Sequence, residues 1–213
     1  MIKVGLSGNR FSGKDEISNI FRRISIPVFE ADVVLRFIIH HDMHVNKQIR
    51  DKLSKLYGTS GNYFSPSFAK TKEEIDIILE CAQHDLFRAY ESFSEKHKSS
   101  IYTIFNSSIL FERGWDKLMN YNINVFAPKI TRMERFQELT KKKVSDIAYL
   151  LRNEIDDLDK NKMANFVVHS YQGRDTRRQV HEIDQFVIDS YLRFEQTSTE
   201  LTQDGQGIIL KHF

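Results

Sequence analysis

The chain has 213 residues, enough for one substantial domain, and its 40% hydrophobic and 28% charged residues indicate a folded globular protein. Its net charge of +2 argues against strong electrostatic binding to nucleic acid, and no apolar stretch approaches the roughly 20 residues that a membrane helix needs. The opening segment has no signal-peptide pattern and Cys81 is the only cysteine, so we expect a cytoplasmic protein without an internal disulfide.

Hydrophobic patterning predicts alternating strands and helices in the first half of the chain. The apolar run "IKVGL" reads as a short strand, and a helix is expected from Lys14 because apolar residues then recur every three or four positions. The elements expected next are a strand at 26–32, a helix at 30–41, a polar helix at 42–56, a loop at 57–67 and a long helix at 72–93.

The second half continues the alternation. Apolar runs predict strands at 99–111, 122–128 and 164–170, and a last helix at 175–195. Residues 205–213 read as an edge strand or a loosely held tail, and the acidic stretch "EIDDLDK" reads as a solvated helix face. We therefore expect one α/β domain over residues 1–213, with a mostly parallel sheet of about five strands that binds ligands at the strands' carboxyl ends.

A glycine-rich loop follows the first strand, in the stretch "GLSGNRFSGKDE". Gly8, Gly13 and Lys14 satisfy the pattern Gly-x-x-x-x-Gly-Lys, in which backbone amides and a helix dipole cradle phosphates while the lysine reaches the β- and γ-phosphates. The alternative is a plain turn with a surface lysine, which the order strand, loop, helix disfavours. We expect ATP to be bound by Gly8, Asn9, Arg10, Phe11, Ser12, Gly13, Lys14 and Asp15.

Asp15 and Phe11 depart from the usual loop. The residue after the lysine is normally Ser or Thr, whose hydroxyl binds Mg²⁺. A carboxylate is also a hard oxygen ligand, so Asp15 is compatible with a strictly metal-dependent site and with one that has lost its chemistry. Phe11 stands where many small-molecule kinases have glycine, because the backbone turns tightly there.

Six segments, in order, carry a resemblance to a known family. They are "IKVGLSGNRFSGK", "IPVFEADVVLR", "LECAQHD", "SILFERGWD", "VFAPKITRMERF" and "KNKMANFVVHS". Together they resemble the dephospho-CoA kinases, which use ATP and Mg²⁺ to phosphorylate the ribose 3′-hydroxyl of dephospho-CoA. The resemblance implies a three-layer P-loop kinase fold with a helical substrate-binding region at about 58–95 and a lid at about 132–154.

The resemblance also implies roles for individual residues. Asp32 matches the acid that orients the acceptor hydroxyl and accepts its proton, although its local sequence fits a helix N-cap equally well. His84 and Glu112 match substrate-side residues, and Arg135 matches a lid arginine that binds phosphate. The chain departs from the family in the lid, where a second arginine is replaced near Leu139, and in the substrate loop.

These departures leave three functions open. The first is a dephospho-CoA kinase, with catalytic residues Lys14 and Asp32, and the second is a kinase for a nucleoside or deoxynucleoside monophosphate. The third is a non-catalytic nucleotide-binding protein that retains the fold. In each case we expect a small-molecule ligand, no nucleic-acid or membrane partner, and a monomer or small homo-oligomer.

Overall fold

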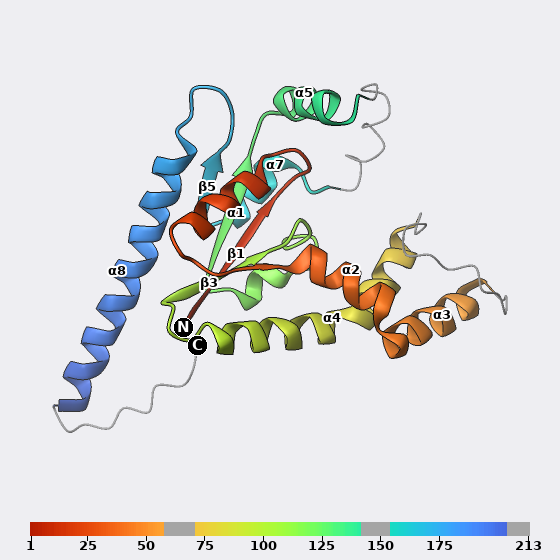
Figure 1. The fold of residues 1–213 in the computed structure, drawn as a ribbon, viewed down its shortest axis with the longest axis horizontal. Coiled ribbons are helices and arrows are strands. Elements are labelled where there is room, and N and C mark those ends of the chain that lie inside the picture. The colour runs from red at the N-terminus through yellow and green to blue at the C-terminus, as the bar shows by residue number, and fades with distance from the viewer. Residues whose placement is uncertain (58–70, 142–153, 204–213) are drawn as a thin grey trace.

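A parallel five-stranded sheet forms the centre of the computed structural model, which describes residues 1–57, 71–141 and 154–203 (Figure 1). The strand order is β2-β3-β1-β4-β5, and each neighbouring pair is parallel. The expected parallel sheet of about five strands is therefore confirmed. The strands are β1 (Ile2–Gly8), β2 (Val28–Glu30), β3 (Tyr102–Asn106), β4 (Tyr121–Phe126) and β5 (Phe166–His169).

Helices cover both faces of this sheet, which makes three layers (Figure 1). One core cluster joins the sheet to α1 (Lys14–Arg23) and α8 (Thr176–Gln203), with Phe21 and Val187 fully buried. The other cluster joins it to α2 (Ala31–His41), α3 (Met43–Tyr57) and α4 (Lys72–Lys96). The remaining described helices are the 3-10 helix η2 (Trp115–Leu118), α5 (Lys129–Thr140) and α7 (Asp157–Met163).

The register of the sheet brings the ends of the inner strands together. Leu6 of β1 is aligned with Asn106 at the end of β3 and with Ile123 of β4. Val4 and Leu6 are fully buried beneath α1 and α8, which explains why this short apolar run forms the central strand. The glycine-rich loop therefore leaves the middle of the sheet at its carboxyl edge.

Several elements differ in length from those expected. The strand expected at 26–32 ends at Glu30, so Asp32 lies in the first turn of α2. The strand expected at 99–111 ends at Asn106, because the buried Leu110 and Phe111 belong to a turn segment packed on the core. The last helix runs on to Gln203, whereas residues 204–213 and most of the loop expected at 57–67 lie outside the described residues.

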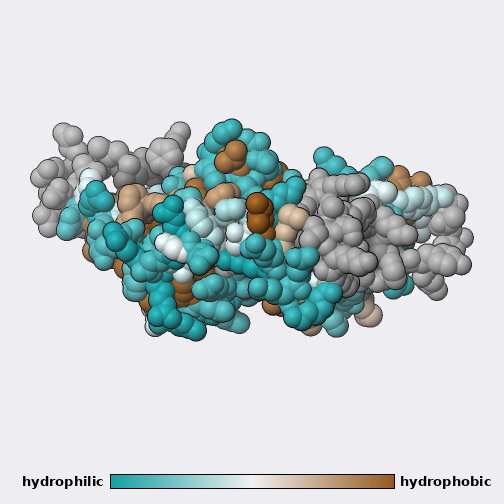
Figure 2. Space-filling view, turned by 90° about the horizontal axis from the view of Figure 1, so that it is seen from above, coloured by the Kyte–Doolittle hydropathy of each residue, from teal (hydrophilic) through white to brown (hydrophobic). Residues whose placement is uncertain are grey.

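The face at the carboxyl ends of the strands is mainly polar. Figure 2 looks onto this side from above the view of Figure 1, and most of the coloured residues visible there are hydrophilic, with hydrophobic ones between them. No helix in the described part of the chain combines the length and the apolar character needed to cross a membrane.

Candidate functional site: a phosphate loop beside a carboxylate

A pocket of about 650 Å³ lies over the glycine-rich loop. The loop residues Gly8 to Asp15 line it together with side chains from α1, α2 and α5. The residue before α1 is Gly13, with φ of +96°, and α1 has no side-chain N-cap among the described residues. The amides of its first turn therefore lack a side-chain acceptor, which suits the oxygen atoms of a phosphate.

The loop turns tightly at Phe11. Its φ is +63°, in the left-handed region that glycine adopts without cost and that a bulky residue adopts at roughly 1–2 kcal/mol. The Phe11 ring packs edge-on against Phe136 of α5, with 5.3 Å between ring centroids. The side chain therefore points to α5, and the tight turn expected at this position is present despite the missing glycine.

Lys14 points along the carboxyl edge of the sheet. Its Nζ donates a 2.7 Å hydrogen bond to Asn106 Oδ1 and lies 3.5 Å from Asp32 Oδ2. Lys14 opens α1, Asn106 ends β3 and Asp32 lies in the first turn of α2, so three elements converge here. The structure thus brings the two residues expected to be catalytic, Lys14 and Asp32, next to each other.

Asp32 is held by the segment that follows β3. Its carboxylate accepts a hydrogen bond from the backbone amide of Ser108, at 2.9 Å to Oδ2, and one from the hydroxyl of Ser107, at 3.1 Å to Oδ1. The N-cap of α2 is Glu30, so Asp32 does not cap its helix. Its orientation is fixed from outside the helix, and Oδ2 stays beside the Lys14 ammonium.

A second acidic residue, Glu30, lies at the same carboxyl edge of the sheet. Glu30 pairs with Arg22 of α1 and accepts a 2.7 Å hydrogen bond from Asn106 Nδ2. The fully buried Asn106 therefore links Glu30 to Lys14 through the two ends of its amide. Sequence reasoning missed Asn106 and the Arg22–Glu30 pair. The available signal was a polar residue ending a buried parallel strand, which marks the sheet edge where ligands bind.

Asp15 lies at the pocket with its side chain 93% exposed. Its Oδ1 is 3.9 Å from Lys14 Nζ. Among the described residues, no three His, Cys, Asp or Glu side chains form a metal-binding group. Mg²⁺ bound to a nucleotide takes most of its ligands from phosphates and water and needs only one or two carboxylates. An exposed carboxylate at the start of α1 fits that requirement.

Arg132 and Arg135 of α5 bind backbone carbonyl oxygens of the glycine-rich loop. Arg135 donates hydrogen bonds to the carbonyl oxygens of Phe11 and Ser12, at 3.1 and 2.8 Å, and to that of Ser170 at 2.7 Å. Arg132 is 4% exposed and donates to the Arg10 carbonyl oxygen at 3.3 Å. The expected phosphate contact of Arg135 stays a prediction, because its guanidinium lines the pocket but is engaged with backbone oxygens. Residues 142–153 of the expected lid lie outside the described residues.

The acidic stretch before β5 is only partly solvated, which corrects the interpretation of "EIDDLDK" as a solvated face. Glu154 and Asp157 both pair with Arg132, at 3.1 and 2.8 Å. Lys160 is fully buried. Glu154, Asp157 and Lys160 are therefore paired with residues distant in sequence, which the local pattern does not contain.

The two remaining candidates do not lie in this pocket. His84 is on α4, with its side chain 80% exposed, and it contacts Asp85 and Arg88 of the same helix. Glu112 pairs with Lys160 at 2.6 Å instead of facing the pocket. Substrate binding by His84 and Glu112 stays a prediction.

One titratable group near the loop has a shifted pKa. His169 ends β5 next to Ser170, and burial, with a smaller contribution from the Arg174 charge, lowers its pKa below the ordinary 6.5. Its backbone is fixed by Gln179, which accepts from His169 N and donates to its carbonyl oxygen. His169 is therefore neutral at neutral pH, and its backbone joins the end of β5 to α8.

Comparisons with known proteins identify the family of this chain. The model of the family described as dephospho-CoA kinase (CoaE) matches residues 2–175. A curated dephospho-CoA kinase from Bacteroides fragilis is 25% identical over 178 residues, covering 78% of this chain and 83% of that protein. One from Rhodopseudomonas palustris is 25% identical over 192 residues, covering 86% and 94%.

The fold also matches a solved structure. The crystal structure of TT1252 from Thermus thermophilus superposes with a TM-score of 0.69 at 18% identity, covering 89% of this chain and 97% of that one. This likeness concerns the fold alone, and it confirms the expected three-layer α/β arrangement.

Proposed function

Because this chain belongs to the dephospho-CoA kinase family, we propose that it is an ATP-dependent kinase that phosphorylates a hydroxyl group of dephospho-CoA or a related nucleotide. Family membership indicates a phosphotransferase. The observation that best supports the specific proposal is the 3.5 Å approach of Lys14 Nζ to Asp32 Oδ2 beside the loop. A group that binds phosphate and one that accepts a hydroxyl proton then share one pocket.

Each of these groups has a separate task in transfer. The amides at the start of α1 bind the phosphates, and Lys14 neutralises charge on the β- and γ-phosphates as the transferred phosphoryl leaves. Asp32 accepts a hydrogen bond from the acceptor hydroxyl and takes its proton as the oxygen bonds to phosphorus. Ser107 and Ser108 hold the carboxylate in one orientation, which keeps the hydroxyl in line.

Magnesium would be held by Asp15, directly or through water, together with the phosphates of the nucleotide. When bound, Mg²⁺ offsets phosphate charge during transfer. Asp15 adds a negative charge at this position where the usual loop has a neutral hydroxyl. We therefore expect nucleotide affinity to depend steeply on magnesium.

The acceptor side of the pocket is formed by the exposed face of α2. Val33 and Arg36 line the pocket one residue and one turn after Asp32. Arg36 donates through Nε to the Asp32 carbonyl oxygen, at 3.4 Å, and its side chain is exposed. Its guanidinium is suited to an anionic group of the acceptor, such as the diphosphate of dephospho-CoA or the phosphate of a mononucleotide.

A kinase assay over a small acceptor panel tests this function. The panel contains dephospho-CoA, the common deoxynucleoside and nucleoside monophosphates, and no acceptor as a blank, each with ATP and Mg²⁺. We expect turnover with dephospho-CoA well above the blank, and its loss in Lys14→Met with the fold retained by circular dichroism. Turnover with a monophosphate alone would reassign the acceptor. Tight ATP binding without any turnover would favour a non-catalytic nucleotide-binding protein.

A further inference from the structure

A buried ion pair joins two segments that are far apart in the sequence. Lys160 of α7 is fully buried, and its Nζ lies 2.6 Å from Glu112 Oε1 in the turn segment after β3. The same oxygen is 3.5 Å from the backbone amide of Ile155. Glu112 Oε2 is also buried and has no hydrogen-bond partner among the described residues. A pair so incompletely hydrogen-bonded offsets little of its desolvation cost, so stability alone is a poor reason for its presence.

Glu112, one end of this pair, belongs to the segment that holds the Asp32 carboxylate. Ser107 and Ser108 bind Asp32, and Glu112 follows only four residues later in the same turn segment. Leu110 and Phe111, between them, are buried in the core on this face of the sheet. A displacement of Glu112 would therefore be passed to the backbone that orients Asp32.

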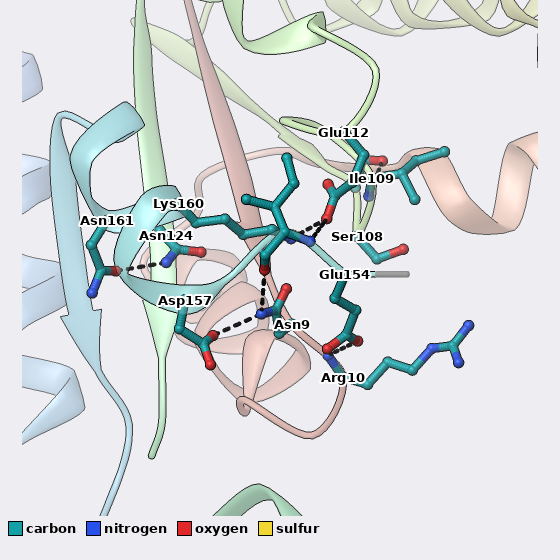
Figure 3. A network of polar contacts seen from close by, with 12 residues as sticks. Asn9, Arg10, Ser108, Ile109, Glu112, Asn124, Glu154, Asp157, Lys160 and Asn161 are labelled. Atoms are coloured by element: carbon teal, nitrogen blue, oxygen red, sulfur yellow. Dashed lines mark hydrogen bonds and ion pairs between the residues drawn. The ribbon is translucent and has the colours of Figure 1, made fainter. Parts of the chain in front are cut away.

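The other end belongs to the segment that holds the phosphate loop (Figure 3). Asn9 Nδ2 donates to the Ile155 carbonyl oxygen at 3.0 Å and to Asp157 Oδ1 at 2.8 Å. The backbone amide of Arg10 donates to Glu154 Oε1 at 2.9 Å. The backbone of Ile155 continues these contacts, because its amide donates to Glu112 Oε1 while its carbonyl oxygen accepts from Asn9. Figure 3 labels Asn9 in the loop and Ser108 and Glu112 in the turn segment at the two ends of this path.

We propose that Glu112 and Lys160 are positioning residues that fix the phosphate loop relative to Asp32. The pair connects the segment 154–160, which binds the loop at Asn9 and Arg10, to the turn segment that binds Asp32. Neither residue lines the pocket over the loop, and in this proposal neither touches ATP or the acceptor. As far as it concerns the reaction, this inference rests on the proposed kinase function, in which two groups must be aligned within a fraction of an ångström.

The variants are chosen to remove the charges and keep the volume. Lys160→Met alone leaves the Glu112 carboxylate buried without its cation, which strongly destabilises a fold. The decisive variant is therefore Glu112→Gln/Lys160→Met, with Glu112→Gln alone as the milder form. The matched control is Val187→Ala, which creates a cavity under α8 on the opposite face of the sheet and lowers the melting temperature without touching either segment.

Kinetics and calorimetry form the first arm of the test. We expect the double variant to keep its ATP affinity within about threefold and to lose roughly tenfold or more in kcat, because a small misplacement of reacting groups is costly. Val187→Ala should keep its kcat at a comparable loss of melting temperature. If Glu112→Gln instead raises only the KM for the acceptor, and Lys160→Met adds nothing to it, Glu112 binds the acceptor directly and the inference is refuted.

Amide hydrogen exchange forms the second arm and needs no catalysis. We expect exchange in the double variant to accelerate both in residues 8–13 and in residues 107–114, and in neither segment in Val187→Ala. Acceleration confined to the surroundings of residue 160 would overturn the inference. This arm is independent of turnover. If the chain transfers no phosphate, the proposed function is refuted, but hydrogen exchange still decides the role of the pair.

Discussion

Replacing Gly13 by alanine should destabilise the phosphate loop far more than a surface glycine replacement does. Gly13 has φ of +96°, and an added Cβ would fall well inside the van der Waals radius of Ser170 Oγ and 3.2 Å from Arg135 Nη1. Ser170 is 1% exposed, so its hydroxyl cannot swing into solvent. The left-handed backbone costs about 1 kcal/mol net, and the overlap adds roughly 1–3 kcal/mol.

The chain offers its own control for this argument. Gly173 also has a positive φ, +81°, but an added Cβ would have no atom within 4 Å. With about 2–4 °C of melting temperature per kcal/mol for a protein of this size, we expect Gly173→Ala, at about 1 kcal/mol, to lose roughly 2–4 °C. Gly13→Ala, at roughly 2–4 kcal/mol, should lose roughly 4–16 °C in differential scanning calorimetry. Ser170→Ala should restore part of the loss in the Gly13→Ala background. Equal losses for the two glycine variants would refute the steric reasoning.

Three further outcomes are expected. Asp32→Asn should keep ATP affinity within about twofold by calorimetry but slow transfer roughly 10²-fold or more, and an unchanged rate would exclude Asp32 as the base. Asp15→Thr should strengthen ATP binding measured with a chelator and leave binding with Mg²⁺ similar or better; a native chain equally tight in both conditions would contradict a metal role for Asp15. The pKa of His169 is lowered in the folded state, so its contribution to stability is complete above pH 6.5 and is lost as the pH falls below that value. The urea-unfolding free energy of the native chain should therefore decline between about pH 7.5 and about pH 5.5. His169→Phe should flatten this decline.

The fold could be predicted wherever the information was local. The helix from Lys14 and the long helix α4 follow from apolar residues at helical spacing, and both begin where the sequence indicated. The ends of β2 and β3 could not be located in this way. The apolar residues 109–111 pack on the core whether they extend a strand or form a turn, so hydrophobicity does not distinguish the two.

The sequence likewise identified some residues of the candidate site and missed others. Lys14 was assigned from the glycine-rich loop motif, whereas Asp32 was assigned from the family resemblance, because its local sequence fitted a helix N-cap equally well. The structure brings the two side chains together at the carboxyl edge of the sheet, although β3 lies between β1 and β2. The partners that orient them were not assigned, since Asn106 and Ser108 act through side-chain and backbone directions that periodicity does not encode. Lys160 was missed because a lysine in an acidic stretch is ordinarily solvated, and its buried partner, Glu112, is distant in the sequence.

The long-range contacts of the loop have a consequence for synthesis of the protein. Asn9 and Arg10 bind partners that lie 144 to 148 residues further along the chain. At about 5–20 residues per second, the ribosome needs roughly 7–30 s to deliver those partners after the loop has emerged. The nascent loop therefore lacks its hydrogen-bond partners Glu154, Ile155 and Asp157 while most of the sheet is synthesised. Nucleotide binding should appear late in translation, after the segment 154–160 has left the exit tunnel.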